Sequence, residues 1–117
     1  MQDESFYCLH SELCKTLANA KRQQILDCLR DGELTVGSVV ACTGFSQANV
    51  SQHLALMRAR GIVNSRRDGA HVHYSIANPK IIQAFDLISE AMAEFLASQN
   101  QTVDQAVGRK QTPIEKE

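Results

Sequence analysis

The chain has 117 residues, a formal net charge of −1 and a hydrophobic fraction of 44%, which fits one globular domain and excludes a disordered regulator. The longest unbroken apolar run is four residues, far short of the roughly 20 that a membrane-spanning helix needs. The first dozen residues contain acidic side chains and no basic segment followed by an apolar stretch, so we expect no secretory signal, no membrane partner and a cytoplasmic location.

Four short helices are predicted in the first half of the chain. Apolar residues recur at helical spacing in residues 4–18, and further helices are expected at 20–30, 35–43 and 46–60. Each of the last three has a suitable N-cap before it and a glycine that can end it: Asn19 and Gly32, Thr35 and Gly44, Ser46 and Gly61.

The apolar spacing then changes. From Ile62 to Ile76 apolar residues alternate loosely around Asp68-Gly69, a dipeptide that favours a two-residue turn, and this predicts a β-hairpin of two strands. After Pro79 a fifth helix is expected, with an apolar face broad enough to be covered partly by a second copy of the chain. From about residue 99 the composition turns polar, so residues 99–117 are expected to form a disordered tail.

Charge is distributed unevenly along the chain. Residues 46–80 hold five Lys or Arg against one acidic residue, whereas residues 1–45 hold four against six and residues 81–117 three against six. A basic segment between acidic flanks is typical of a phosphate-binding surface, although a solvated charged face would have the same composition.

Two short helices joined by a glycine-containing turn form a helix-turn-helix, and the second of them has the outer face of a recognition helix. Val50, Leu54 and Met57 form its buried stripe, which leaves short or amide side chains, and no acids, facing outward. Such side chains bond base edges or meet thymine methyl groups. His53 lies near the buried stripe and is either a DNA contact or a structural histidine. The candidate DNA-binding residues of this helix are Ser46, Gln47, Ala48, Asn49, Ser51, Gln52 and His53.

The predicted hairpin follows the recognition helix directly, which makes the unit a winged helix-turn-helix. Arg66, Arg67 and His71 lie around its tip, where they could contact phosphates or a minor groove. Asp68 is expected to form the turn together with Gly69. The fold class is therefore mainly α with a small β-hairpin.

In combination, several segments of the chain resemble the ArsR/SmtB family of bacterial and archaeal repressors over about residues 5–97. These segments are Leu17–Leu26, Gly32–Leu34, Phe45–Leu54, Leu56, Gly61–Val63, Arg66–Gly69 and His73–Ile76. Ala20 departs from the family, which usually has proline there, and this affects only a helix start.

The resemblance implies a homodimer held by the first and last helices. It also implies binding to an inverted-repeat operator in double-stranded DNA and release when an effector binds. Residues 1–98 would then be the DNA-binding and dimerisation domain. The family's usual arsenite thiols are missing from Glu33–Gly37, and the zinc or nickel site of the last helix is absent because residues 78–98 contain no histidine.

The remaining sensing candidates are the cysteines, which we expect to be thiols rather than structural disulfides. His10 and Cys14 are four residues apart on one helix, and Cys8 lies nearby, so the three could hold a thiophilic metal or metalloid ion, or the thiols could form a disulfide or polysulfide bridge. Cys14 could equally pack against the partner's helix. Cys28 is expected to be a small buried hydrophobe, and Cys42 either a redox site or buried beside Val39.

The sequence bears on three classes of function. The leading one is a dimeric repressor with a thiol-directed effector, either a metal(loid) ion or a reactive oxygen or sulfur species. The alternative is a winged helix that responds to another ligand or acts as an architectural or interaction module. An enzyme is not expected, because the sequence has no glycine-rich phosphate loop, no paired carboxylates in a plausible pocket and no catalytic triad.

Overall fold

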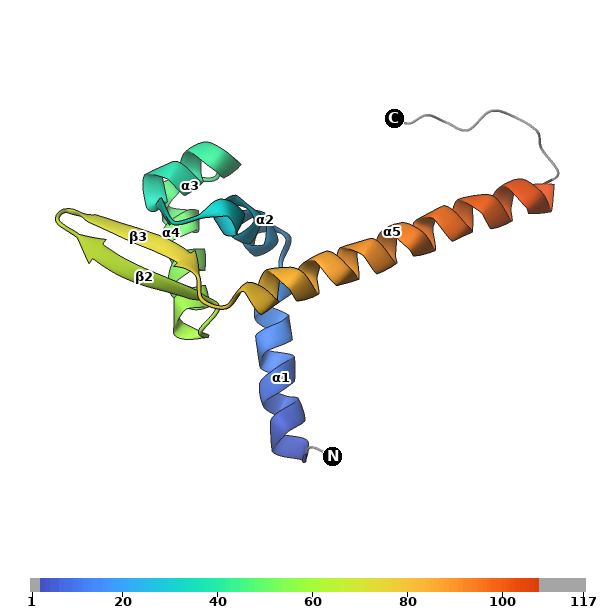
Figure 1. Cartoon of the computed structure of the whole chain (residues 1–117), viewed down its shortest axis with the longest axis horizontal. Coiled ribbons are helices and arrows are strands. Elements are labelled where there is room, and N and C mark those ends of the chain that lie inside the picture. Colours follow the sequence, from blue (N-terminus) through green and yellow to red (C-terminus); the bar gives the residue numbers. More distant parts are fainter. Residues whose placement is uncertain (1–2, 108–117) are drawn as a thin grey trace. The chain divides into compact units, whose positions relative to one another are not determined.

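The computed structural model describes the backbone of residues 3–107 and the side chains of residues 3–100. The chain divides into two compact units at residues 82 and 83 (Figure 1). The helices and strands, in chain order, are α1 (Glu4–Leu17), α2 (Ala20–Cys28), the short 3₁₀ helix η1 (Leu29–Asp31), β1 (Leu34–Thr35), α3 (Val36–Thr43), α4 (Gln47–Ala59), β2 (Val63–Asp68), β3 (His71–Ile76) and α5 (Pro79–Val107). Among the described residues, none of the helices combines the length and the apolar composition that a membrane span requires.

The predicted helix starts are confirmed. The side chains of Asn19, Thr35 and Ser46 accept hydrogen bonds from the backbone N–H groups of Arg22, Ser38 and Asn49 respectively, which satisfies donors that the first turn of a helix leaves unpaired. Asp3 caps α1 in the same way. Each cap and its donor are only three residues apart, so the helix starts could be predicted from the local sequence.

The first unit contains a three-stranded antiparallel sheet in the order β1-β3-β2. The two predicted strands are present, with Val63 opposite Ile76 and Asp68 opposite His71. The third strand, β1, was not predicted: Leu34 and Thr35 pair with Tyr74 and His73. A strand of two residues is too short to have a recognisable apolar alternation.

The hairpin turn lies one residue later than expected. Asp68 is paired in the ladder, so the turn consists of Gly69 and Ala70, and Gly69 has a φ of +63°. Among the described residues only glycines have positive φ. A glycine at the first central position, followed by a residue of negative φ, fits a type II′ turn rather than the Asp-Gly turn that the sequence suggested.

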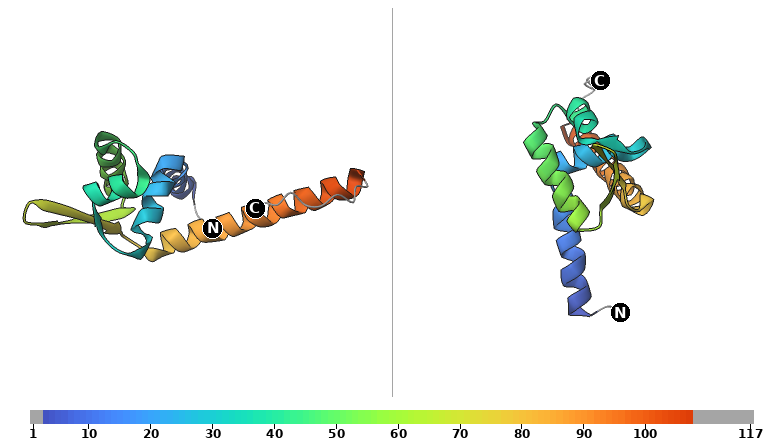
Figure 2. Two further views of the ribbon diagram at one scale, coloured as in Figure 1. Left: turned by 90° about the horizontal axis from the view of Figure 1, so that it is seen from above. Right: turned by 90° about the vertical axis from the view of Figure 1, so that its left-hand side faces the viewer.

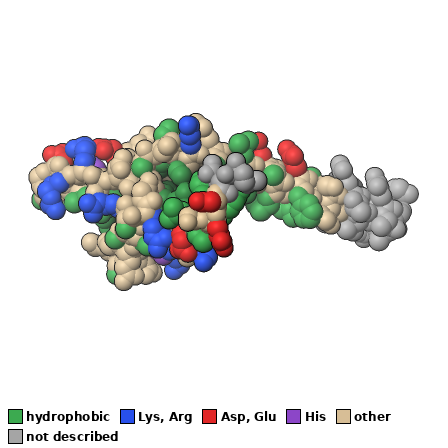
Figure 3. Space-filling model, turned by 90° about the horizontal axis from the view of Figure 1, so that it is seen from below, with side chains coloured by type: hydrophobic (Ala, Val, Ile, Leu, Met, Phe, Trp, Pro, Cys, Tyr) green, Lys and Arg blue, Asp and Glu red, His purple; other side chains and the backbone are tan. Residues whose placement is uncertain are grey.

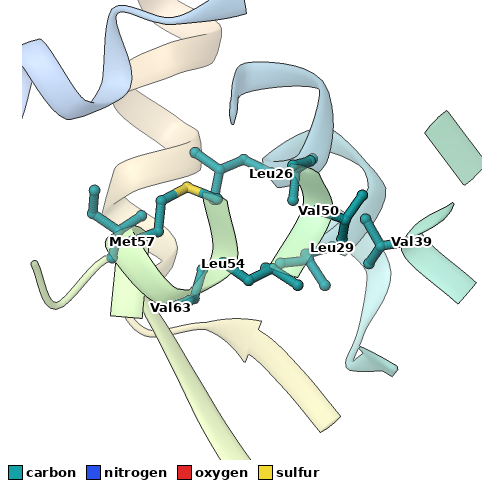
Figure 4. Close-up of a cluster of buried hydrophobic side chains, with 9 residues drawn as sticks. Leu26, Leu29, Val39, Val50, Leu54, Met57 and Val63 are labelled. Carbon is teal, nitrogen blue, oxygen red and sulfur yellow. The ribbon is translucent and has the colours of Figure 1, made fainter. Parts of the chain in front are cut away.

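The core of the first unit joins three helices to the base of the hairpin (Figure 4). Val50, Leu54 and Met57 of α4 are fully buried, as predicted. The remaining core residues are Ile25, Leu26, Leu29, Val39, Ile62 and Val63. Removal of this apolar surface from water is the main force that fixes α4 in place.

In the second unit α5 continues to Val107, past the domain end expected at residue 98. Residues 108–117, the rest of the expected tail, lie outside the described residues. The apolar face predicted for this helix is present and exposed, with Ile88 70% and Phe95 59% accessible. Leu87, Met92 and Leu96 are also exposed.

The expectation of four free thiols is wrong. Cys28 and Cys42 form a disulfide that joins the end of α2 to the end of α3, while Cys8 and Cys14 are free and exposed. Cys42 is itself exposed rather than buried beside Val39, and Cys28 is half-buried. Fourteen residues separate the bonded pair, so no local pattern indicated that they meet.

Candidate DNA-binding surface

Helix α4 presents one polar face to solvent because its other face is fixed in the core. The turn before it is tight: Gly44 ends α3 with a φ of +80°, and the N–H of Phe45 donates to the hydroxyl of Thr43 at 3.1 Å. Ser46 then caps α4. Helices α3 and α4, joined by this turn, therefore confirm the predicted helix-turn-helix.

The candidate base-contacting residues lie on the exposed side of α4. Gln47, Ala48, Ser51 and Gln52 are exposed, and Asn49 is half-buried. No acidic residue occurs in α4, so nothing on the helix itself repels a phosphate backbone. The amide and hydroxyl side chains on this face can donate hydrogen bonds to base edges and accept them, and Ala48 can meet a thymine methyl group.

His53 is tied to the body of the domain. Its Nδ1 lies 3.4 Å from the guanidinium of Arg22, whose Nε donates to the backbone oxygen of Thr16 at 2.6 Å. Partial burial, followed by the nearby charges of Arg22 and Lys21, lowers the pKa of His53 below its ordinary value of 6.5. His53 is therefore neutral at pH 7 and accepts from Arg22, which favours the structural role over the direct DNA contact.

Two basic residues missed by the sequence analysis stand beside α4. Arg22 is the partner of His53, and Lys21 lies 5.3 Å from the ring centre of Phe45 in the turn before α4. Both come from α2, outside the basic segment of residues 46–80. The positive region is thus assembled from two parts of the chain.

One arginine of the β2–β3 hairpin, called the wing below, is already paired. The single Nε–H of Arg66 is shared between both carboxylate oxygens of Glu33, and Nη2 donates to one of them. Arg66 also lies 4.0 Å from Asp68. The hydrogen bond from Arg66 holds the pKa of Glu33 below its ordinary value. If Arg66 contacts a phosphate, as predicted, the phosphate must compete with the carboxylate of Glu33, which lies 33 positions away in sequence.

Arg67 and His71 are exposed on the wing, and in the described part of the chain neither has an ion pair. Figure 3 shows basic and acidic side chains together at the hairpin end of the molecule, and Figure 2 shows the hairpin projecting from the helices of its unit. Arg67 is thus the wing arginine available to a phosphate.

The three donors proposed for a metal on α1 are only partly brought together. Cys14 Sγ lies 3.5 Å from His10 Nδ1, but no group of three His, Cys, Asp or Glu side chains that could hold an ion exists among the described residues. The expected Cys8, His10 and Cys14 set is therefore not formed within one chain. All three side chains are exposed.

These features define a winged helix-turn-helix DNA-binding domain. The model of the arsR family of bacterial regulatory proteins matches residues 19–65. The chain is 36% identical over 98 residues to the uncharacterized HTH-type transcriptional regulator Rv0081 of Mycobacterium tuberculosis, covering 83% of this chain and 86% of that protein. The chain belongs to the ArsR family of transcriptional regulators, which bind DNA and are not enzymes.

Solved structures agree with this assignment. The crystal structure of Rv0081 has a TM-score of 0.75 at 35% identity and covers 83% of this chain and 98% of that one. The homodimeric winged helix-turn-helix DNA-binding domain Mb0332 of Mycobacterium bovis has a TM-score of 0.72 at 31% identity, covering 81% and 91%. The antimony-specific transcriptional repressor AntR has a TM-score of 0.71 at 30% identity, covering 83% and 86%.

Proposed function

We propose that the chain is a sequence-specific repressor that binds an inverted-repeat operator as a homodimer. The observation that carries this proposal is the division of α4 into a fully buried stripe and an exposed face of short and amide side chains without acids. Residues Gln47, Ser51 and Gln52 would read base edges in the major groove, and Arg67 and His71 would contact the backbone or the minor groove.

The homodimer is proposed from two exposed apolar surfaces. On α1, Phe6, Tyr7 and Leu9 are exposed, and Leu9 is 73% accessible although its position in the apolar stripe predicts burial. The apolar face of α5 is exposed as well. Exposed apolar side chains in this number on a small domain favour an interface, and the related Mb0332 domain is homodimeric.

The effector is proposed to act on a cysteine, with Cys8, Cys14 and Cys42 as candidates. All three are exposed, and Cys8 and Cys14 are free thiols. AntR is an antimony-specific repressor, and thiolates favour such soft ions. Because one chain brings together no three donors in its described part, a metalloid bound at His10 and Cys14 would need a further donor from the second copy.

The test is a fluorescence-anisotropy titration against DNA from the region upstream of the gene and against random DNA, at fixed salt. Gln52→Ala should weaken operator binding by about 1–3 kcal/mol and leave random DNA unaffected. Gln24→Ala is the matched control, because Gln24 is an exposed glutamine on α2 whose side chain donates to Ala20 of its own helix.

The same titration, repeated with a thiol oxidant or polysulfide and with arsenite or cadmium, tests the effector. Release by one of these classes identifies the effector chemistry. Equal affinity of the unmodified protein for operator and random DNA would contradict sequence-specific repression and favour an architectural module. Specific binding that no thiol reagent changes would favour a different ligand.

A further inference from the structure

We propose that Cys28 and Cys42 form a reversible thiol–disulfide site that clamps α3 to α2, and that closure of this bond releases the protein from operator DNA. The inference rests on the proposed function, which it deepens by locating the sensing chemistry away from α1. Cys28 is the last residue of α2 and Cys42 the penultimate residue of α3.

The pair is placed for reversible chemistry. The two Cα atoms are 6.4 Å apart, within the range that a disulfide bridges without backbone movement. Cys42 is exposed and Cys28 half-buried, so oxidants and reductants can reach the sulfur atoms. Neither sulfur belongs to the apolar core, whose nine buried residues pack without it. The fold therefore has its own stabilisation in the dithiol form.

The segment that the bond closes contacts the wing and leads along the chain into α4. Glu33, which holds Arg66 of the wing, lies inside it, and so does β1, which pairs with β3 of the wing. At its far end the segment leads through Thr43 and Gly44 to Ser46, the cap of α4. A restraint on the end of α3 is thus transmitted to the first turn of α4 and to the wing.

Bond closure needs a two-electron oxidant, for which a peroxide is the simplest class. The thiolate of one cysteine attacks a peroxide oxygen, which breaks the O–O bond and gives a sulfenic acid and hydroxide. The second cysteine then attacks the sulfenic sulfur, forming the S–S bond and releasing water. In total two thiols and one hydrogen peroxide give one disulfide and two waters. A dithiol reductant reverses the change by exchange.

Closure should weaken binding because α4 must adjust its first turn to the groove. With the bond open, the end of α3 and the turn at Thr43 to Ser46 are held only by packing and hydrogen bonds. With the bond closed, this end is covalently fixed to α2. Because protein interiors have low compressibility, a restraint on the end of α3 also limits the movement of the elements packed against it.

The experiment measures operator affinity by anisotropy for full-length protein, first reduced and then after hydrogen peroxide has been added and removed by catalase. The proteins are the wild type, Cys28→Ser, Cys42→Ser and the control Cys8→Ser/Cys14→Ser, which removes both free thiols and leaves the pair. Mass spectrometry of alkylated peptides reports the bond directly, and non-reducing electrophoresis detects bonds between chains.

Wild type and the control should lose at least about tenfold in operator affinity on oxidation and regain it on reduction, a size usual for coupled sites. Both single variants should bind alike in the two conditions. The inference is overturned if the bond forms and affinity is unchanged or increased, or if peroxide still releases Cys42→Ser. Cys42 is exposed, so this variant tests the inference even where Cys28→Ser impairs folding. Failure of reduced wild type to prefer operator over random DNA would instead contradict the proposed function.

Discussion

The recognition helix α4 and the wing both carry residues predicted to contact DNA, but different factors decide which of their side chains are available. On α4 the outward side chains are set by the helix's own spacing, because burial of Val50, Leu54 and Met57 decides which residues face solvent. On the wing, one of two neighbouring arginines is occupied by Glu33, which is distant in sequence, and the other is exposed.

Residue identity alone therefore does not give the charge that is available to a ligand. Arg66 and Arg67 are equivalent in the sequence, but the carboxylate of Glu33 offsets the charge of Arg66. Conversely, Lys21 and Arg22 of α2 supply positive charge beside α4 that the basic segment of residues 46–80 did not include. Five predictions test this contrast between α4 and the wing.

The largest effect is expected on the buried side of α4. Leu54→Ala should lower the free energy of unfolding by about 2–5 kcal/mol, because it removes apolar contacts and leaves a cavity in the core. Ser51→Ala, on the exposed side of the same helix, should change it by no more than about 0.5 kcal/mol. Urea unfolding at one protein concentration measures both. Equal losses would show that the division of α4 into two faces is wrong.

The next effect separates the two wing arginines. Arg67→Ala should reduce the slope of log affinity against log salt by about 0.9 and weaken operator and random DNA alike, because one phosphate contact is lost. Arg66→Ala should reduce the slope by less, since Glu33 competes with phosphate for this side chain. Anisotropy over a range of salt concentrations gives both slopes. A larger change for Arg66→Ala would contradict the assignment.

A smaller effect is expected from Glu33→Gln, which removes the carboxylate and makes Arg66 available to phosphate. Random-DNA affinity should rise and the salt slope should steepen by up to about 0.9. Asp31→Asn, a nearby exposed acid without this partner, is the control, and the double variant Glu33→Gln/Arg66→Ala should cancel the gain. A gain that persists in the double variant would mean that general charge, not Arg66, is responsible.

The lowered pKa of Glu33 makes the stabilisation by the Glu33–Arg66 pair depend on pH. Because Arg66 lowers the pKa of the folded protein's Glu33 below 4.5, the pair stabilises the fold above that pH. Its contribution is lost as the pH falls through the lowered folded value. Wild type should therefore lose more stability than Glu33→Gln below pH 4.5.

The smallest effect concerns His53. The pKa of His53 is lowered in the folded protein, so the unfolded chain binds the proton more readily, and stability should fall as the pH drops below 6.5. His53→Gln should remove about 1–2 °C of the difference between the thermal midpoints at pH 7.5 and pH 5. His71→Gln, exposed on the wing, should keep the wild-type difference. An identical pH profile for both variants would show that the lowered pKa of His53 does not contribute to the pH dependence of stability.

The helices and most of the candidate interface were predictable because their determinants lie close together in sequence. Asn19, Thr35 and Ser46 each bond a donor three residues later, and the buried stripe of α4 repeats within the helix. The hairpin was also found, but its turn was placed one residue early. Pairing of Asp68 with His71 determines the turn, and pairing depends on the register of the whole ladder.

The order of the α-helices, the caps of α2, α3 and α4 and the face that α4 turns outward were predictable from the sequence, because they depend on contacts within one or two helical turns. The contacts of Glu33 with Arg66, of Arg22 with His53 and of Cys28 with Cys42 depend on the tertiary fold instead, because they join residues 33, 31 and 14 positions apart in sequence. The path of the chain between such residues is fixed by packing of the common core, and no local pattern contains that information.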